Sequence, residues 1–451
     1  PTHSEVRLAS GGSVAAVSVP GVGVYTWDVL GNETDMAYSY PLPAGDAIVV
    51  TGSGRVLYQG DSSLSVAHGY VRPAAGAEWN ETFAGGPPDL TGFGLGMAMS
   101  DAGTVAITTD PTANDSAGIA FPAVMGDVST NGFLVESSQV LAVLSAGDKF
   151  GTNVELSGDG SVAAFYSHFD FDYAARPTQM GRVTIMQRSG AYDWETTAVI
   201  EAPSDWTVFD PAEAAYVQFN LRSHLFGHSL ALNRDGTVLA VGAPFFNSHY
   251  GRAFVFVEAG GSWALDATLD YAPPDAAFDD AGPTTQFGQS VALDDAGRTL
   301  AVLARGSANH AATSVYHRAA TGWTLARFLY EPTGDHPLPE SVTVGGRGQM
   351  VDMSGDASRL LLPGLHVLTD GAPRAALVGI ADTVGETLLL PRLFDGVAMY
   401  KFSGSEGWAA VNLTASTAFW AIPGVPAAAA GVGQVLFAPV ASGTMVTVPV
   451  H

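Results

Sequence analysis

The sequence lacks cysteine, is poor in positive charge and has no long apolar run. A chain without cysteine forms no disulfide bond, but a domain of this size does not need one, so the absence says little about the compartment. Lysine and arginine number 19 against 44 acidic residues, which gives a net charge of −25. This acidity argues against binding of nucleic acid, whose phosphates require a basic surface. No apolar run reaches the length of about 18 residues that a membrane-spanning segment needs.

The chain begins at Pro1, with neither an initiator methionine nor a signal peptide, so we expect it to be processed or to be part of a longer protein. Hydrophobic residues make up 47% of it, which is ample for a core. Its sequons are more numerous than its composition leads us to expect, and they fall at Asn32, Asn80, Asn114 and Asn412. We therefore predict a secreted or cell-surface protein that carries N-glycans at these positions, on an exposed rim.

The stretch from Phe226 to Trp263 shows the local pattern best. Short apolar runs at Ser229–Leu232, Val238–Val241 and Ala253–Val257 are separated by turn residues such as Asn233–Gly236. Brief runs of Val, Leu and Phe between turns indicate antiparallel strands in a meander. The stretch therefore predicts a four-stranded sheet.

The same pattern recurs along the chain. The turn before the second strand ends on Gly12, Gly54, Gly103, Gly160, Gly236, Gly297 and, in the seventh unit, Ala357. A Phe-Gly pair opens the first strand at Phe93, Phe150, Phe226 and Phe287, and Trp opens the fourth strand at Trp79, Trp194, Trp263, Trp323 and Trp408. One Trp at one place in each unit indicates a residue that packs between sheets.

The spacing of the repeats favours a radial arrangement. The intervals between turn glycines are unequal, which suits blades around an axis better than a solenoid whose repeats must stack in register. Seven units are predicted near residues 5–40, 46–86, 93–142, 150–200, 226–270, 287–330 and 348–414. In the last unit, 397–402 with 408–413 fits the outer hairpin better than 374–380 with 387–390 does. The strands within 415–451 are expected to close or cap the ring, or to form a degenerate extra blade.

Phe226-Gly227 and Gly242-Ala243-Pro244 resemble the two halves of the FG-GAP repeat of integrin α-subunit propellers. The resemblance covers about residues 5–414 and is most specific in the fifth unit. It implies an all-β fold, a seven-bladed β-propeller of four-stranded antiparallel blades, with eight blades possible if the C-terminal strands form one. The calcium loop of that family is absent, because turns such as Asn233–Gly236 are too short and offer too few oxygens. We predict no metal and no cofactor.

The two faces of such a ring differ in this sequence. The turns between strands 1 and 2, and between strands 3 and 4, are tight and form what we call the plain face. The connections between strands 2 and 3, and between strand 4 and the next blade, include the long segments 167–181, 202–225 and 273–286. Loops of such length often bind something, so we call this side the loop face and expect function there.

Two groups on the loop face are candidate binding residues. Phe245, Phe246, His249 and Tyr250 form an aromatic group typical of recognition surfaces, although they could equally pack under a neighbouring loop.

The second group, His168, Asp170, Asp172 and Tyr173, alternates so that both carboxylates of an extended segment would point the same way, although a solvated loop is the simpler interpretation.

Neither paired carboxylates nor a nucleophile–base set stands out, so we predict no catalytic residue and a non-enzymatic, adhesion-like protein. Its expected partners are proteins or glycans, bound through the loop face. A first alternative is a structural subunit of an extracellular filament, coat or appendage, which would contact copies of itself or other subunits. A propeller-type enzyme comes third, and a cluster of carboxylates in the central channel would favour it.

Overall fold

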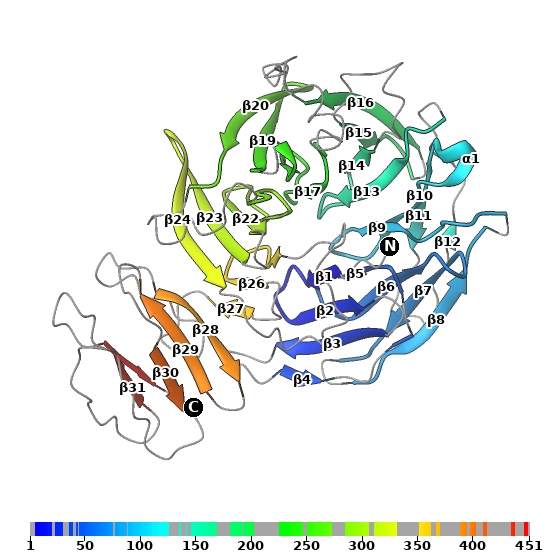
Figure 1. Ribbon diagram of the computed structural model, residues 1–451. Helices are drawn as coiled ribbons and strands as arrows, with labels where there is room; N and C mark the ends of the chain where they lie inside the picture. The colour runs from blue at the N-terminus through cyan, green and yellow to red at the C-terminus, as the bar shows by residue number, and fades with distance from the viewer. Residues whose placement is uncertain are drawn as a thin grey trace, which may run out of the picture.

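The computed structural model describes much of the first 361 residues and shorter pieces beyond them. The described backbone covers residues 5–19, 23–29, 36–38, 42–43, 45–74, 77–87, 89–125, 135–136, 141, 146–168, 181–191, 193–202, 225–246, 250–272, 285–305, 311–331, 351–361, 367–369, 388–394, 397–402, 409–412, 434–437 and 446–449. Within these residues the structure is almost entirely β (Figure 1). The one helical label, α1 (Ala113–Ser116), is a turn in which Asn114 and Asp115 have positive φ.

Six antiparallel sheets of four strands follow one another along the chain. The first three are β1–β4 (Glu5–Leu8, Val14–Val19, Gly23–Val29, Met36–Tyr38), β5–β8 (Ala47–Val50, Val56–Asp61, Val66–Val71, Asn80–Gly85) and β9–β12 (Gly96–Met99, Val105–Asp110, Ile119–Met125, Val135–Glu136). The next three are β13–β16 (Phe150–Leu156, Val162–Ser167, Arg182–Arg188, Trp194–Glu201), β17–β20 (Ser229–Leu232, Val238–Ala243, Arg252–Ala259, Ser262–Leu269) and β21–β24 (Ser290–Leu293, Thr299–Arg305, Ala311–Ala319, Gly322–Glu331).

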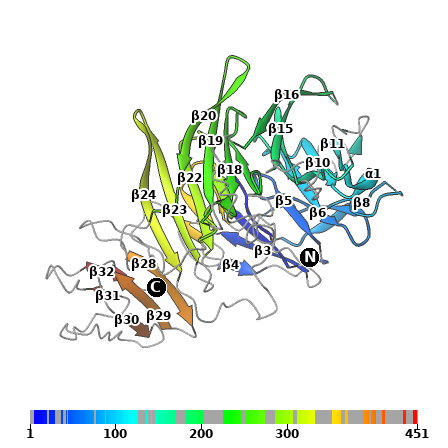
Figure 2. The same cartoon turned by 45° about the horizontal axis from the view of Figure 1, so that its top comes forward.

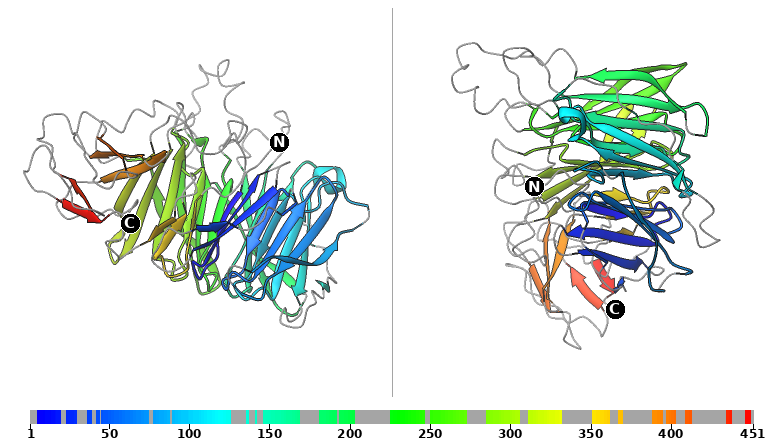
Figure 3. Two further views of the ribbon diagram at one scale, coloured as in Figure 1. Left: turned by 90° about the horizontal axis from the view of Figure 1, so that it is seen from below. Right: turned by 90° about the vertical axis from the view of Figure 1, so that its right-hand side faces the viewer.

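A seventh sheet closes these six into a ring. It consists of β25 (Asp352–Met353), β26 (Arg359–Leu361) and β27 (Val367–Thr369). The innermost strands contact one another in the order β1, β5, β9, β13, β17, β21 and β25, and β25 contacts β1 again. The sheets therefore stand as blades around a central axis (Figure 1), seen edge-on in Figure 3, and we call the region enclosed by the innermost strands the channel. The predicted fold class, an all-β propeller of four-stranded antiparallel blades, is confirmed.

The C-terminal strands lie outside this ring (Figure 2). They form a three-stranded sheet, β28–β30 (Leu388–Phe394, Val397–Phe402, Ala409–Asn412), and a hairpin, β31–β32 (Gln434–Phe437, Val446–Pro449). Strand β28 contacts β24 of the sixth blade. The segments that we expected to complete the seventh blade, 397–402 and 408–413, contribute β29 and β30, which pair with each other but lie in this separate sheet, where β29 also pairs with β28. The predicted domain limits stay a prediction.

The tight turns between first and second strands are fixed by their first residue. In the fourth blade the Ser157 hydroxyl accepts hydrogen bonds from the backbone N–H groups of Ser161 and Val162, at 3.1 and 3.0 Å. In the fifth blade the Asn233 side-chain oxygen accepts from Thr237 and Val238, both at 2.8 Å. A short polar side chain at this place satisfies the backbone donors that the turn leaves free. The turn glycine, at φ of 65° to 74° in these two blades, completes the bend.

The seven turns are joined to one another by backbone hydrogen bonds of 2.7 to 3.3 Å. The N–H donates and the carbonyl accepts in the pairs Gly11–Gly52, Gly52–Asp101, Asp101–Gly158, Asp159–Arg234, Arg234–Asp295, Asp295–Gly355 and Gly355–Ser10. We call this closed circle the turn ring. Because it includes all seven blades, it holds the inner ends of the blades at one height on the plain face.

The Phe-Gly pairs anchor each blade to the one before it. Phe150, Phe226 and Phe287 are fully buried, and each such ring contributes about 1.5–3 kcal/mol through loss of apolar contact with water. Gly227 has φ of 100°, and a Cβ there would lie 2.4 Å from the buried Tyr166 ring of the preceding blade. The glycine therefore lets two blades approach closely.

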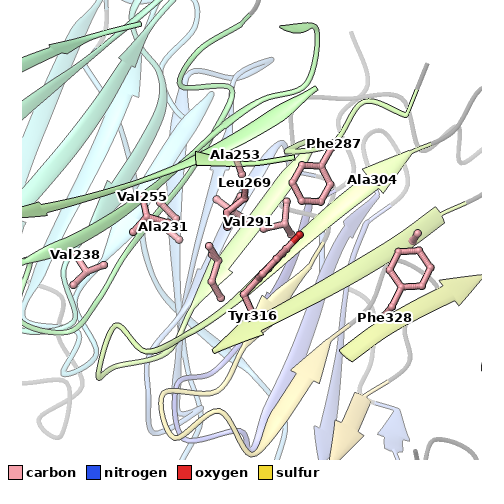
Figure 4. Packing of buried hydrophobic residues seen from close by; sticks show 14 residues of the cluster. Ala231, Val238, Ala253, Val255, Leu269, Phe287, Val291, Ala304, Tyr316 and Phe328 are labelled. Carbon is pink, nitrogen blue, oxygen red and sulfur yellow. The ribbon is translucent and has the colours of Figure 1, made fainter. Parts of the chain in front are cut away.

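Apolar side chains fill the spaces between blades. Figure 4 shows the core between the fifth and sixth blades, where Phe287, Val291 and Tyr316 meet Val255 and Leu269.

The repeated Trp residues also link neighbouring blades, as predicted. The indole N–H of Trp323 donates to Asp266 of the fifth blade at 2.9 Å, and that of Trp79 donates to Thr26 of the first blade at 2.9 Å. Trp79 and Trp323 therefore each connect an outer strand to the preceding sheet.

A pair of glycine substitutions tests the close approach of the blades. Gly260→Ala, in an open turn with φ of 63° and no atom near its Cβ, should lower the free energy of unfolding by about 1 kcal/mol through backbone strain alone. Gly227→Ala should lower it by about 3 kcal/mol or more, because overpacking against Tyr166 adds to the strain. Urea unfolding of both variants measures the difference. Equal effects of the two substitutions would show that contact between the added Cβ at position 227 and Tyr166 does not limit how closely the blades approach.

Candidate functional site

Each inner strand contributes one residue to the channel wall at the same level as the equivalent residues of the other blades. It is the residue two places before the 1–2 turn, and the turn ring places all seven at one height. In four blades this residue is small and apolar, namely Val49, Ala98, Ala231 or Ala292. In the other three it is charged, namely Arg7, Glu155 or Asp352. The small residues leave room for the long charged ones.

The charged residues meet in the channel. Arg7 pairs with Glu5 of its own strand at 2.7 Å and with Glu155 at 3.5 Å. Arg7 is in the first blade and Glu155 in the fourth, which are not neighbours in the ring, so this contact crosses the channel. Asp352 of the seventh blade accepts a hydrogen bond from the backbone N–H of Leu8 at 2.7 Å. We call Glu5, Arg7, Glu155 and Asp352 the channel cluster.

The cluster is held firmly but keeps some contact with solvent. The Arg7 guanidinium donates to the Ile48 carbonyl at 3.2 Å, and Glu5 accepts from the Ile48 N–H at 2.9 Å. The side chains of Glu5 and Arg7 are 11% and 10% exposed, whereas that of Glu155 is 21% exposed. Of these three side chains, Glu155 is therefore the most accessible to a small molecule.

The electrostatics of the cluster favour a bound proton. Burial raises the pKa of Glu155 to about 7, and the charges of Asp352 and Glu5 add to this effect, whereas Arg7 opposes it. Burial likewise raises the pKa of Asp352 to about 6, and it raises that of Glu5. Burial disfavours the charged form of Arg7, but the three carboxylates outweigh it and raise the pKa of Arg7. One guanidinium thus faces three carboxylates, and Glu155 changes its charge near neutral pH.

In the fourth and fifth blades the position equivalent to Glu5 is polar and uncharged, namely Asn153 and Ser229. Asn153 donates to the His228 carbonyl at 3.0 Å, and the Ser229 hydroxyl donates to the Gly288 carbonyl at 2.9 Å. The Nε2 atom of His228 lies 3.1 Å from the side-chain nitrogen of Gln289. Each bond joins two neighbouring blades, so this part of the channel wall is pre-organised.

The predicted aromatic group is partly used within the chain. Phe246 is half-buried against the core between the fourth and fifth blades, and the Arg252 guanidinium lies 4.2 Å over its ring. Arg252 in turn pairs with Asp270 at 2.6 Å. Phe245 is also half-buried, whereas Tyr250 is 46% exposed. Phe246 therefore packs inward, against the core and beneath Arg252 of its own blade.

The remaining predicted residues are only partly within the described structure. His168 is half-buried, and its Nδ1 atom lies 3.0 Å from the Tyr166 hydroxyl. His249, Asp170, Asp172 and Tyr173 lie outside the described residues. The role of both groups in binding stays a prediction.

Two of the four sequon asparagines, Asn80 and Asn114, are described and exposed. Asn32 and the side chain of Asn412 lie outside the described residues.

The part of the chain that the structure describes contains no group of three or more His, Asp or Glu residues arranged to hold a metal ion. It also contains no helix long and apolar enough to cross a bilayer.

Sequence reasoning missed the channel cluster because its members are far apart in the chain and form no motif. The available signal was a charge in an inner strand that is otherwise apolar. Where the fifth blade reads Ser-Leu-Ala-Leu, the first reads Glu-Val-Arg-Leu and the fourth Asn-Val-Glu-Leu.

No family model and no curated protein matches the chain. Among solved structures, it is similar to the Cps50 (Swd1) β-propeller domain of Myceliophteria thermophila, with a TM-score of 0.50, 12% identity, and coverage of 80% of this chain and 94% of that one. The chain has the β-propeller fold.

It is also similar to provisionally assigned 6-phosphogluconolactonases from two Bacteroides species. For the B. fragilis protein the TM-score is 0.49 at 13% identity, with coverage of 77% of this chain and 86% of that one. For the B. uniformis protein the values are 0.47, 12%, 71% and 82%. Identities this low show the fold alone.

These comparisons correct the function expected from the sequence. We expected an integrin-like, adhesion-like protein and no enzyme, but two of the similar structures carry an enzyme's name and none of the three is an integrin or adhesion protein. The expectation of an adhesion protein rested on analogy of fold, and one fold hosts many functions.

The raised pKa values predict how stability depends on pH. A carboxyl whose pKa is raised on folding binds its proton more tightly in the folded state, so its contribution is present at low pH and is lost as pH rises through the folded value. For Glu155 this loss of stability should occur as the pH rises from 4.5, the ordinary pKa of the group, to about 7, its pKa in the folded protein. Glu155→Gln, which stays neutral, should lose less stability over this range than the wild type. Thermal melts from pH 5 to pH 8 measure this.

Glu195→Gln is the control, because Glu195 is exposed on the outer strand β16. It should keep the wild-type slope. An unchanged slope in Glu155→Gln would show that Glu155 titrates normally.

Proposed function

We propose that the chain is a propeller-type enzyme that performs acid–base chemistry at the channel cluster. The observation that carries this proposal is Glu155, a partly exposed carboxylate with a pKa of about 7, paired across the channel with Arg7. A group whose pKa lies near the working pH is the most effective general acid or base. Perturbed carboxylates in a concave site are the physical signature of such chemistry.

The reaction class that these groups suit is hydrolysis of a small ester or lactone. The ionised Glu155 carboxylate would accept a proton from a water molecule while the oxygen of that water attacks the ester carbonyl carbon. The C–O bond to the leaving group would then break, and protonated Glu155 would return the proton to the leaving alkoxide. The products are the carboxylic acid and the alcohol, and Glu155 ends in its starting state.

The other three members of the cluster would position Glu155. The Arg7 charge stabilises the ionised form of Glu155 and would also favour negative charge developing on the substrate. Glu5 and the Ile48 carbonyl fix the guanidinium in place. The Asp352 charge raises the pKa of Glu155 towards neutrality.

In this proposal, the Phe-Gly pairs that resemble FG-GAP repeats serve to pack the blades together. Burial of Phe226 and the close approach of two blades at Gly227 explain the Phe-Gly pair, so no binding partner is needed to explain it.

Secretion remains part of the proposal, supported by the exposure of Asn80 and Asn114. Mass spectrometry of native material tests it, and unmodified peptides around both asparagines would contradict it.

Glu155→Gln should abolish hydrolysis of small esters and lactones, lowering kcat by about 100-fold or more, the usual contribution of a general base. The wild-type rate should rise with pH through a limb near pH 7. A pH-stat assay over a panel of neutral esters and lactones measures both.

Glu195→Gln should retain full activity in the same assay. Wild-type protein that hydrolyses none of the panel, or Glu155→Gln with wild-type kcat, would refute the proposed function.

A further inference from the structure

The channel also carries charge at its plain-face mouth. With neighbouring strands about 4.8 Å apart, a circle of seven hydrogen-bonded turns leaves an opening roughly 11 Å across between opposite backbones. Several residues of the turn ring carry a charge. They are Asp101, Asp159, Arg234 and Asp295.

Arg234 crosses part of this mouth. Its guanidinium pairs with Asp101 of the third blade at 3.0 Å and with Asp295 of the sixth blade at 3.4 Å. The first of these contacts passes over the turn of the fourth blade, where a Cβ on Gly158 would lie 2.4 Å from the Asp101 carboxylate. We call Asp101, Arg234 and Asp295 the mouth latch.

The mouth latch and the channel cluster together contain more acidic than basic groups. Together these residues carry five carboxylates and two guanidiniums, Arg7 and Arg234, and both guanidiniums already form ion pairs. The polar residues at and next to the level of Glu5, namely Asn153, Ser229, His228 and Gln289, add no Lys or Arg. An anionic group entering this channel would therefore meet no unpaired cation among these residues.

We propose that the channel accepts neutral or positively charged substrates and rejects anionic ones, such as esters that carry a free phosphate or carboxylate group. This inference rests on the proposed function and names the substrate class of the same site. The physical reason is Coulombic, because an added negative charge about 10 Å from one uncompensated carboxylate loses roughly a factor of ten in binding at an effective dielectric constant of 20.

Three esters that differ only in a remote substituent test the charge preference. One carries a hydroxyl, one a quaternary ammonium and one a phosphate, on the same reacting ester. Wild-type kcat/KM should be highest for the ammonium ester, intermediate for the hydroxyl ester and at least about tenfold lower for the phosphate ester. The differences should shrink at high ionic strength. A phosphate ester that reacts as well as the hydroxyl ester would overturn the inference while leaving the proposed function intact.

A charge variant locates the effect in the channel. Asp352→Asn removes one cluster carboxylate and should reduce the ratio of ammonium to phosphate ester several-fold, whatever it does to the absolute rate. Asp193→Asn, in an exposed turn, should keep the wild-type ratio. An unchanged ratio in Asp352→Asn would contradict selection by the channel cluster.

A binding assay separates this inference from the proposed function. Non-hydrolysable amide analogues of the three esters are added to Glu155→Gln, and the shift in Tm is measured. The ammonium and hydroxyl analogues should raise Tm, and the phosphate analogue should not. If no ester reacts but this order of shifts holds, the proposed function fails and the charge selection stands. A larger shift with the phosphate analogue, or no shift with any analogue, overturns the selection.

Discussion

The turn ring is the constraint on which the rest of the structure depends. Its seven backbone hydrogen bonds require each 1–2 turn to have one backbone shape, which residues such as Ser157, Asn233 and Gly236 impose locally. Once the turns are level, the inner strands are in register around the channel, because side chains alternate with a period of two along each strand. Arg7, Glu155 and Asp352 then reach the same height although they are far apart in the sequence. The candidate site is thus a consequence of ring closure.

Charge at the level of the channel cluster is not a general feature of the blades. Four of the seven equivalent positions are Val or Ala, and a buried group of charges is generally less stabilising than well-packed apolar residues. A site that departs from the apolar pattern of its neighbours and retains an excess of carboxylates is where functional demands are expected to override stability. The cluster also differs from the inter-blade bonds made by Trp79 and Trp323, which are matched pairs without excess charge. This contrast supports a chemical role for Glu155.

Loop length and family analogy both point to the loop face, whose role in binding stays a prediction. The long connections of the loop face are real in the sequence, but the described part of the aromatic group there includes Phe246, which packs inward beneath Arg252. The Phe-Gly resemblance is likewise accounted for by burial of Phe226 and close approach at Gly227. Both features therefore report on how the blades are joined. The structure places the strongest electrostatic perturbation in the channel instead, where four residues from three blades meet.

The sequence by itself determined the repeat, the strand order within a blade and the tight turns, because these depend on residues close together in the chain. Ser157 to Val162 and Asn233 to Val238 fold in much the same way, and a reader of the sequence could identify both. It also indicated the Trp contacts, since one Trp recurs at one place in each unit. Only the tertiary structure decided that Arg7 and Glu155 meet, because their contact requires the two intervening blades to turn the chain around the channel. The same holds for the C-terminal strands, whose pairing partner β28 no local pattern specified. Long-range contacts of this kind depend on ring closure, which no single repeat encodes.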